Sequence, residues 1–172
     1  MTEPLWKPTP EEIESTEMTR YMRSLDQKFD DYASMWEWSV TERADFWESI
    51  WKFGEVRSSK AYESVVENPA KMPGVKWFPG ARLNFAENLL RFRDDHPAIL
   101  FQGEGQAQRS LSYRELYDQV SRLAKAMRAH GIKAGDRIAG FVPNMPEAIV
   151  AMLAATSIGA IWSSCSPDFG IK

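Results

Sequence analysis

The chain has 172 residues, of which 44% are hydrophobic and 26% are charged, and its formal net charge is −3 at pH 7. This composition excludes a disordered chain, and the acidic balance argues against a general affinity for nucleic acid or anionic membranes. One cysteine and two separated histidines exclude an internal disulfide and a metal cluster. No run approaches the ~18 apolar residues of a membrane span, and the first residues lack an apolar leader, so we expect a cytoplasmic protein without nucleic-acid or membrane partners.

The distribution of aromatic residues predicts two regions. Six of the seven tryptophans lie within the first 77 residues, where five of the ten prolines also occur. The hydrophobic pattern then changes near residues 80–95. We therefore predict a region of helices and loops over residues 1–90 and an α/β region over residues 91–172.

The first region is predicted to be helical. Apolar spacing predicts one helix within the first 35 residues, with Thr9 and Thr16 as alternative N-caps. A second helix is predicted to begin at a capping box formed by Ser39 and Glu42 and to end at Gly54.

An apolar stripe follows one face of this second helix: Val40, Phe46, Trp47, Ile50 and Trp51. Such a stripe is either a ligand platform or a face that packs on a larger body. The packing interpretation is favoured, because apolar helix faces normally belong to the core.

Clear local signals mark the elements that follow. Asn84, with Glu87 three residues on, is predicted to cap a short helix. Residues 97–113 predict a β-hairpin, and Ser112 with Glu115 forms a capping box for a long helix that ends near residue 131.

The last third of the chain has the pattern of a βαβ unit. "DRIAGFVP" predicts a buried strand, Asn144 and Glu147 are predicted to cap the next helix, and "AIWSSC" predicts a second strand. Such a unit places its two strands parallel. The expected fold class is α/β: an aromatic-rich helical region followed by the start of a doubly wound core. We expect strand 160–165 to be central and both sheet faces to be covered by helices.

Ligands of doubly wound sheets bind beyond the carboxyl ends of the strands. Pro143-Asn144 and Ser166–Asp168 follow two such ends, and they are the candidate site. Glycine-rich phosphate loops and nucleophile elbows are absent from the sequence. Cys165 is interpreted as a small buried hydrophobe rather than a nucleophile, and His96 and His130 as structural residues. We therefore expect no catalytic residue and no metal ligand in this chain.

The segment "WFPGARLNFAENLL", residues 77–90, resembles acyl-CoA synthetases. "MWEWSV" and residues 135–170 resemble the acetoacetyl-CoA synthetase family in particular, and the resemblance covers nearly the whole chain. It implies an adenylate-forming enzyme that converts acetoacetate, ATP and CoA, with Mg, to acetoacetyl-CoA, AMP and diphosphate through an acyl-adenylate. It also implies that the phosphate loop, the ribose-binding aspartate and the catalytic lysine lie further along a longer chain. We therefore expect an N-terminal piece whose partner is the rest of the synthetase, and which alone is inactive and binds these cofactors poorly.

By position, the resemblance implies that Ser166, Pro167 and Asp168 lie near the nucleotide end of bound CoA. A carboxylate normally repels a phosphorylated ligand, so the alternative is a structural turn in which Asp168 caps the next helix. Two other function classes remain open: the same region of another short-chain acyl-CoA synthetase, and a non-enzymatic α/β interaction module. The acyl-chain pocket is expected downstream of this chain.

Overall fold

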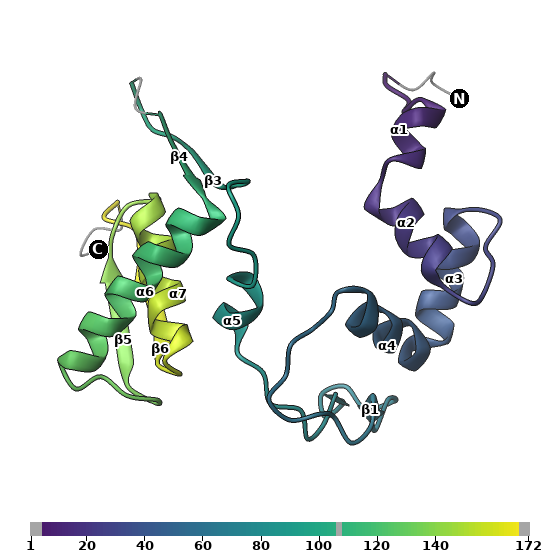
Figure 1. The fold of residues 1–172 in the computed structure, drawn as a ribbon. Coiled ribbons are helices and arrows are strands. Elements are labelled where there is room, and N and C mark those ends of the chain that lie inside the picture. The colour runs from purple at the N-terminus through teal and green to yellow at the C-terminus, as the bar shows by residue number, and fades with distance from the viewer. Residues whose placement is uncertain (1–4, 106–107, 169–172) are drawn as a thin grey trace. The chain divides into compact units, whose positions relative to one another are not determined.

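The computed structural model describes residues 5–105 and 108–168. Its contacts divide the chain into two compact units, which Figure 1 shows as ribbons. Unit 1 comprises residues 1–56 and 60–81, and unit 2 comprises residues 57–59 and 82–172. This division rests on contacts within the chain and falls after residue 81. It does not test the predicted domain boundary after residue 90, which therefore stays a prediction.

Unit 1 is mainly helical, with one short antiparallel ladder. Its elements are α1 (Pro10–Glu14), α2 (Glu17–Ser24), α3 (Tyr32–Thr41), α4 (Arg43–Phe53), β1 (Val66–Glu67) and β2 (Lys76–Trp77).

The prediction of one helix in the first 35 residues is wrong, because both candidate N-caps are used. The Thr9 hydroxyl accepts a hydrogen bond from the Glu12 amide at 3.2 Å and begins α1. The Thr16 hydroxyl accepts from the Thr19 amide at 3.1 Å and begins α2. Each cap satisfies a free amide of its own helix, so the chain forms two short helices.

The predicted capping box of Ser39 and Glu42 is also wrong. The Asp31 carboxylate accepts from the Ser34 amide at 2.8 Å and begins α3 eight residues earlier than expected. Ser39 therefore lies inside α3, where its hydroxyl donates to the Trp36 carbonyl at 2.7 Å. Glu42 precedes α4 but forms no side-chain cap, whereas the predicted end at Gly54 is confirmed.

Phe46 and Trp51 of the predicted apolar stripe pack within unit 1, whereas Val40, which lies in α3, and Trp47 are 48% and 43% exposed. The ring of Trp51 lies 4.5 Å from that of Phe78 and 5.3 Å from that of Tyr62, measured between centroids. Phe46 lies edge-on to Tyr21 at 6.4 Å. These contacts support the packing interpretation over a ligand platform.

Unit 2 contains the hairpin and the βαβ unit that the sequence predicts. Its elements are α5 (Phe85–Leu89), β3 (Pro97–Gln102), β4 (Gln108–Ser112), α6 (Tyr113–Ala129), β5 (Arg137–Phe141), α7 (Pro146–Ser157) and β6 (Ile161–Cys165). Strands β3 and β4 pair antiparallel, and β5 and β6 pair parallel. The core lies where α5, α6 and α7 meet, and it contains Ala86, Leu90, Leu116, Val120, Ala124, Val150, Leu153 and Ala154.

The capping box of Ser112 at the start of α6 is confirmed. The Ser112 hydroxyl accepts from the Glu115 amide at 3.2 Å, and the Glu115 carboxylate accepts from the Ser112 amide at 2.8 Å. The predicted N-cap Asn84 is confirmed for α5 in the same way, with the Glu87 amide at 3.0 Å.

Replacing Ser112 with alanine should lower the free energy of unfolding by about 1 kcal/mol, because the Glu115 amide loses its acceptor at the helix end. Urea unfolding followed by circular dichroism measures this loss. Ser110→Ala, at an exposed position of β4, is the matched control. An equal midpoint for the two variants would contradict the capping role.

Two expectations about the parallel sheet are wrong. Within residues 5–105 and 108–168, β6 pairs with β5 alone, so it is not a central strand. One face of the β5–β6 pair packs against α7, whereas Phe141 and Ile161 on its other face are 66% and 53% exposed. The physical reason is that the single crossover helix of a βαβ unit covers one face only. No helix in the described ranges is long and apolar enough to cross a bilayer.

Candidate strand-end site

The predicted site lies at the carboxyl end of the β5–β6 pair. Arg137 aligns with Ile161 at the start of the pair and Phe141 with Cys165 at its end. The Val142 amide donates to the Cys165 carbonyl at 3.3 Å, which continues the ladder to the last residue of β6. The segments that follow the two strands therefore leave the sheet at the same edge.

The three predicted site residues form a tight polar turn after β6. The Ser166 hydroxyl donates to the Asp168 carboxylate at 2.8 Å and accepts from the Asp168 amide at 3.2 Å. Ser166 is half-buried, and Pro167 and Asp168 are exposed. The Asp168 carboxylate thus has a hydrogen-bond donor inside its own turn. Whether Asp168 caps a further helix lies outside the described residues.

The Trp162 ring of β6 occupies the space beside Gly140 of β5 in which a Cβ atom would lie, and the sequence did not predict this approach. A Cβ atom at Gly140 would lie 2.5 Å from the Trp162 ring atom Cη2. Only a residue without a side chain leaves room for this ring. A glycine inside a strand is the signal for such an approach.

The prediction that Asn144 caps α7 is wrong. Met145 is the N-cap, and its apolar side chain offers no oxygen to the amides of the first turn, whereas Pro146 occupies the first helical position. The Glu147 carboxylate instead accepts two hydrogen bonds from Arg109, each at 2.7 Å. This bidentate pair connects β4 to the first turn of α7, beside the loop that follows β5.

The bonds from Arg109 hold the pKa of the Glu147 carboxyl below its ordinary value, against the opposing effect of desolvation. A carboxyl whose pKa is lower in the folded chain stabilises the fold above its unfolded pKa of about 4.3, and this contribution is lost as the pH falls through the folded pKa.

Glu147→Gln should therefore unfold at a lower temperature than the unchanged chain at pH 7, and the difference should shrink below about pH 4. Because about half of each side chain is exposed, we expect a small effect that salt weakens further. Thermal midpoints of both proteins between pH 3 and pH 7 test this. A difference that stays constant across that range would contradict the ionic role.

The structure also shows the surroundings of Cys165, His130 and His96, which the sequence predicts to be structural residues. Cys165 is exposed, so its interpretation as a buried hydrophobe is wrong, because the β6 face that it shares lacks a covering helix. His130 ends α6 and its Nδ1 atom lies 2.9 Å from the Ala126 carbonyl, which agrees with a structural role. His96 is exposed, and its ring lies 3.1 Å from the Asp94 carboxylate.

Among the described residues, no group of three His, Cys, Asp or Glu side chains is placed to hold a metal.

Comparison with known proteins gives the family context of this site. Residues 85–172 match the model of the AMP-binding enzyme family, and residues 32–89 match that of the acetyl-coenzyme A synthetase N-terminus. The acetoacetyl-coenzyme A synthetase of Rhizobium meliloti (strain 1021) is 45% identical, covering 97% of this chain and 26% of the relative. The malonamoyl-CoA synthetase of Penicillium aethiopicum is 39% identical over 91% of this chain and 23% of its own length.

A solved structure agrees with these sequence matches. The acetoacetyl-CoA synthetase from Streptomyces lividans superposes with a TM-score of 0.87 at 39% identity, and the match covers 98% of this chain and 27% of that protein. The chain therefore spans about a quarter of the length of the relatives that it matches. The resemblance found in the sequence is confirmed, and the α/β fold is that of an adenylate-forming enzyme. Because the AMP-binding model covers half of the chain, this protein belongs to the AMP-binding enzyme family.

Proposed function

We propose that this chain is the N-terminal part of an ATP-dependent acetoacetate–CoA ligase. The single observation that supports this most strongly is the 45% identity to an acetoacetyl-coenzyme A synthetase over 97% of the chain. The complete enzyme would join acetoacetate to AMP with release of diphosphate, and CoA would then displace AMP. Its cofactors would be ATP, CoA and Mg, and the partner of this chain would be the rest of the synthetase. The enzyme would act in the cytoplasm, in the lipid metabolism of a ketone body.

Within this proposal, the turn of Ser166, Pro167 and Asp168 borders the nucleotide end of CoA. Its position at the carboxyl end of two parallel strands supports this, because ligands of such sheets bind there. The internal bond from the Ser166 hydroxyl supports it as well, since it partly offsets the charge of Asp168 toward an anionic ligand.

The experiment is a chimera in which this chain replaces the matching first quarter of the Rhizobium relative. We expect AMP release that depends on acetoacetate and CoA, whereas the 172-residue chain alone should release no diphosphate. A folded chimera that is inactive with acetoacetate, or activity of the chain alone, would contradict the proposal.

A second candidate is a synthetase for another short acyl group. The 39% identity to a malonamoyl-CoA synthetase favours it, because this region is shared between enzymes named for different acyl groups. Measuring AMP release by the protein of the complete reading frame, with acetoacetate and with malonamate as the acid, separates the two candidates. The same measurement also tests the alternative of a non-enzymatic module.

A further inference from the structure

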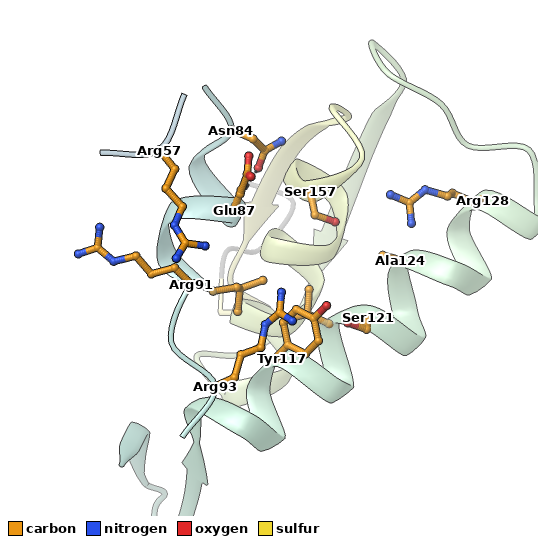
Figure 2. Close-up of a pocket in the computed structure, with 12 residues that line it drawn as sticks. Arg57, Asn84, Glu87, Arg91, Arg93, Tyr117, Ser121, Ala124, Arg128 and Ser157 are labelled. Atoms are coloured by element: carbon orange, nitrogen blue, oxygen red, sulfur yellow. Dashed lines mark hydrogen bonds between the residues drawn. The ribbon is translucent and has the colours of Figure 1, made fainter. Parts of the chain in front are cut away.

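Unit 2 contains an elongated groove along α5 and α6, which is separate from the strand-end turn. Its volume is about 560 Å³, and its lining comes from these two helices, the end of α7 and residues on either side of α5 in the sequence (Figure 2). Ser157 lines the groove at the carboxyl end of α7, which leads into the amino end of β6. The α5–α6 groove and the turn therefore lie at opposite ends of the βαβ unit.

Three arginines of the α5–α6 groove have no carboxylate partner. Arg57, Arg93 and Arg128 are exposed, and none of the ion pairs within residues 5–105 and 108–168 involves them. Glu87 is the single carboxylate among the described lining residues. The chain as a whole has a formal charge of −3. The groove is thus opposite in sign to the whole chain and attracts a negatively charged ligand.

The three guanidinium groups are spread along the groove. The Arg93 guanidinium lies 3.8 Å from the centre of the Tyr117 ring. Arg128 lies in the last turn of α6, eleven residues after Tyr117, and this stretch of helix is about 16 Å long. Figure 2 shows Arg57 and Arg93 on the left of the groove and Arg128 on the right. A ligand that contacts both ends must therefore be extended.

The backbone of Arg57 is anchored to α5. The Asn88 Oδ1 atom accepts from the Arg57 amide at 2.8 Å, and the Asn88 Nδ2 atom donates to the Arg57 carbonyl at 2.9 Å. These two bonds hold Arg57 beside the helix, although 31 positions separate the residues in the sequence. The Arg57 side chain therefore starts from a fixed point at the groove.

The floor of the groove favours a charged ligand over an apolar one. Leu90, Val120 and Ala124 are only 6%, 2% and 4% exposed, so an apolar ligand would remove little further apolar surface from water. Contacts with the arginines must therefore supply most of the affinity.

The lining also favours an acidic protein segment over a nucleic acid. Sites for single-stranded nucleic acid combine positive charge with aromatic rings on which bases stack. Tyr117 is the single aromatic residue among the described lining residues, and the Arg93 guanidinium already lies over its ring. Carboxylates need no such platform, because a guanidinium binds a carboxylate through two parallel hydrogen bonds.

We propose that the α5–α6 groove binds an extended acidic segment of a partner protein, about six residues long or longer. An extended chain rises about 3.3 Å per residue, so six residues span the distance between the two ends of the groove. A segment in the groove leaves the outer sides of the guanidinium groups in water. A folded domain over them would remove these charges from water at a large cost in desolvation.

Fluorescence anisotropy of labelled hexaglutamate, titrated with the 172-residue chain at low salt, tests the proposal. We expect saturable binding that is about tenfold tighter than that of labelled diglutamate, which is too short to reach both ends. The affinity should fall about threefold in each of Arg57→Gln, Arg93→Gln and Arg128→Gln, and more than about tenfold in the triple variant.

Arg122→Gln is the matched control, because Arg122 is an exposed arginine of α6 outside the groove, and its loss should leave the affinity unchanged. Labelled hexaserine should not bind. Circular dichroism spectra equal to that of the unchanged chain confirm that the variants are folded.

Four results would overturn the proposal. The first is absence of saturable binding, and the second is an equal loss in Arg122→Gln, which would indicate general attraction to positive charge. Binding of a six-residue oligothymidylate as tight as that of hexaglutamate would assign the groove to nucleic acid. Loss of hexaglutamate binding in the protein of the complete reading frame would show that its own remaining chain covers the groove. These outcomes are independent of the chimera's activity.

Discussion

Replacing Leu153 with alanine is expected to destabilise unit 2 by about 2–5 kcal/mol, the largest effect of any substitution considered. Leu153 is 2% exposed and lies in the cluster formed by α5, α6 and α7. Removal of its side chain leaves a cavity that rigid helices on both sides fill only in part. Native-state hydrogen exchange of the α6 and α7 amides measures the loss in unit 2 directly.

The matched control is Ile149→Ala on the same helix. Ile149 is 37% exposed, so its truncation should cost about 1 kcal/mol or less. The amides of α4 in unit 1 provide an internal reference whose exchange should not change. Equal losses for the two substitutions would show that Leu153 does not belong to a packed core.

Replacing Gly140 with alanine should destabilise the β5–β6 pair by about 1–3 kcal/mol through overpacking. The new methyl group would overlap the Trp162 ring, which must rotate away or push the strands apart. Urea unfolding followed by circular dichroism measures the loss of stability, and the same readout serves variants that lack Trp162.

A double-mutant cycle separates the contact from a general intolerance of β5. Trp162→Leu should restore most of the stability that Gly140→Ala loses, with a coupling energy of about 1 kcal/mol or more. Ala139→Val is the control, since Ala139 is exposed on the other sheet face and has room for a larger side chain. Additive effects of Gly140→Ala and Trp162→Leu would contradict the contact.

Local signals in the sequence predicted much of the fold. An N-cap side chain and the amide that it accepts from lie three positions apart here, so Thr9, Asn84 and Ser112 were identifiable without knowledge of the fold. Errors arose where two local signals competed. Ser39, with Glu42 three residues on, has the pattern of an N-cap but lies inside α3, which Asp31 caps. Pro146 occupies the first position of α7, so the helix begins beyond Asn144.

Features that depend on distant residues were not predictable in the same way. The Asn88 side chain, for example, accepts from the Arg57 amide at 2.8 Å and donates to the Arg57 carbonyl at 2.9 Å, and no local pattern predicts bonds between residues 31 positions apart. The exposure of Cys165 depends on which helices cover the sheet, and the pattern of β6 contains no information about that. The strand-end turn was predictable, because the topology of a βαβ unit fixes which ends of the strands meet.

Strands β5 and β6 form a parallel pair that presents the Ser166–Asp168 turn at its carboxyl end. Hydrogen exchange of the chain tests it directly. The Ile161 amide, which donates to the Asp136 carbonyl at 2.8 Å, and the Val142 amide, which donates to the Cys165 carbonyl, should exchange slowly, and the Asn144 amide in the following loop should exchange fast. Exchange at Ile161 and Val142 as fast as at Asn144 would contradict the claim, because the turn would then have no formed sheet to hold it.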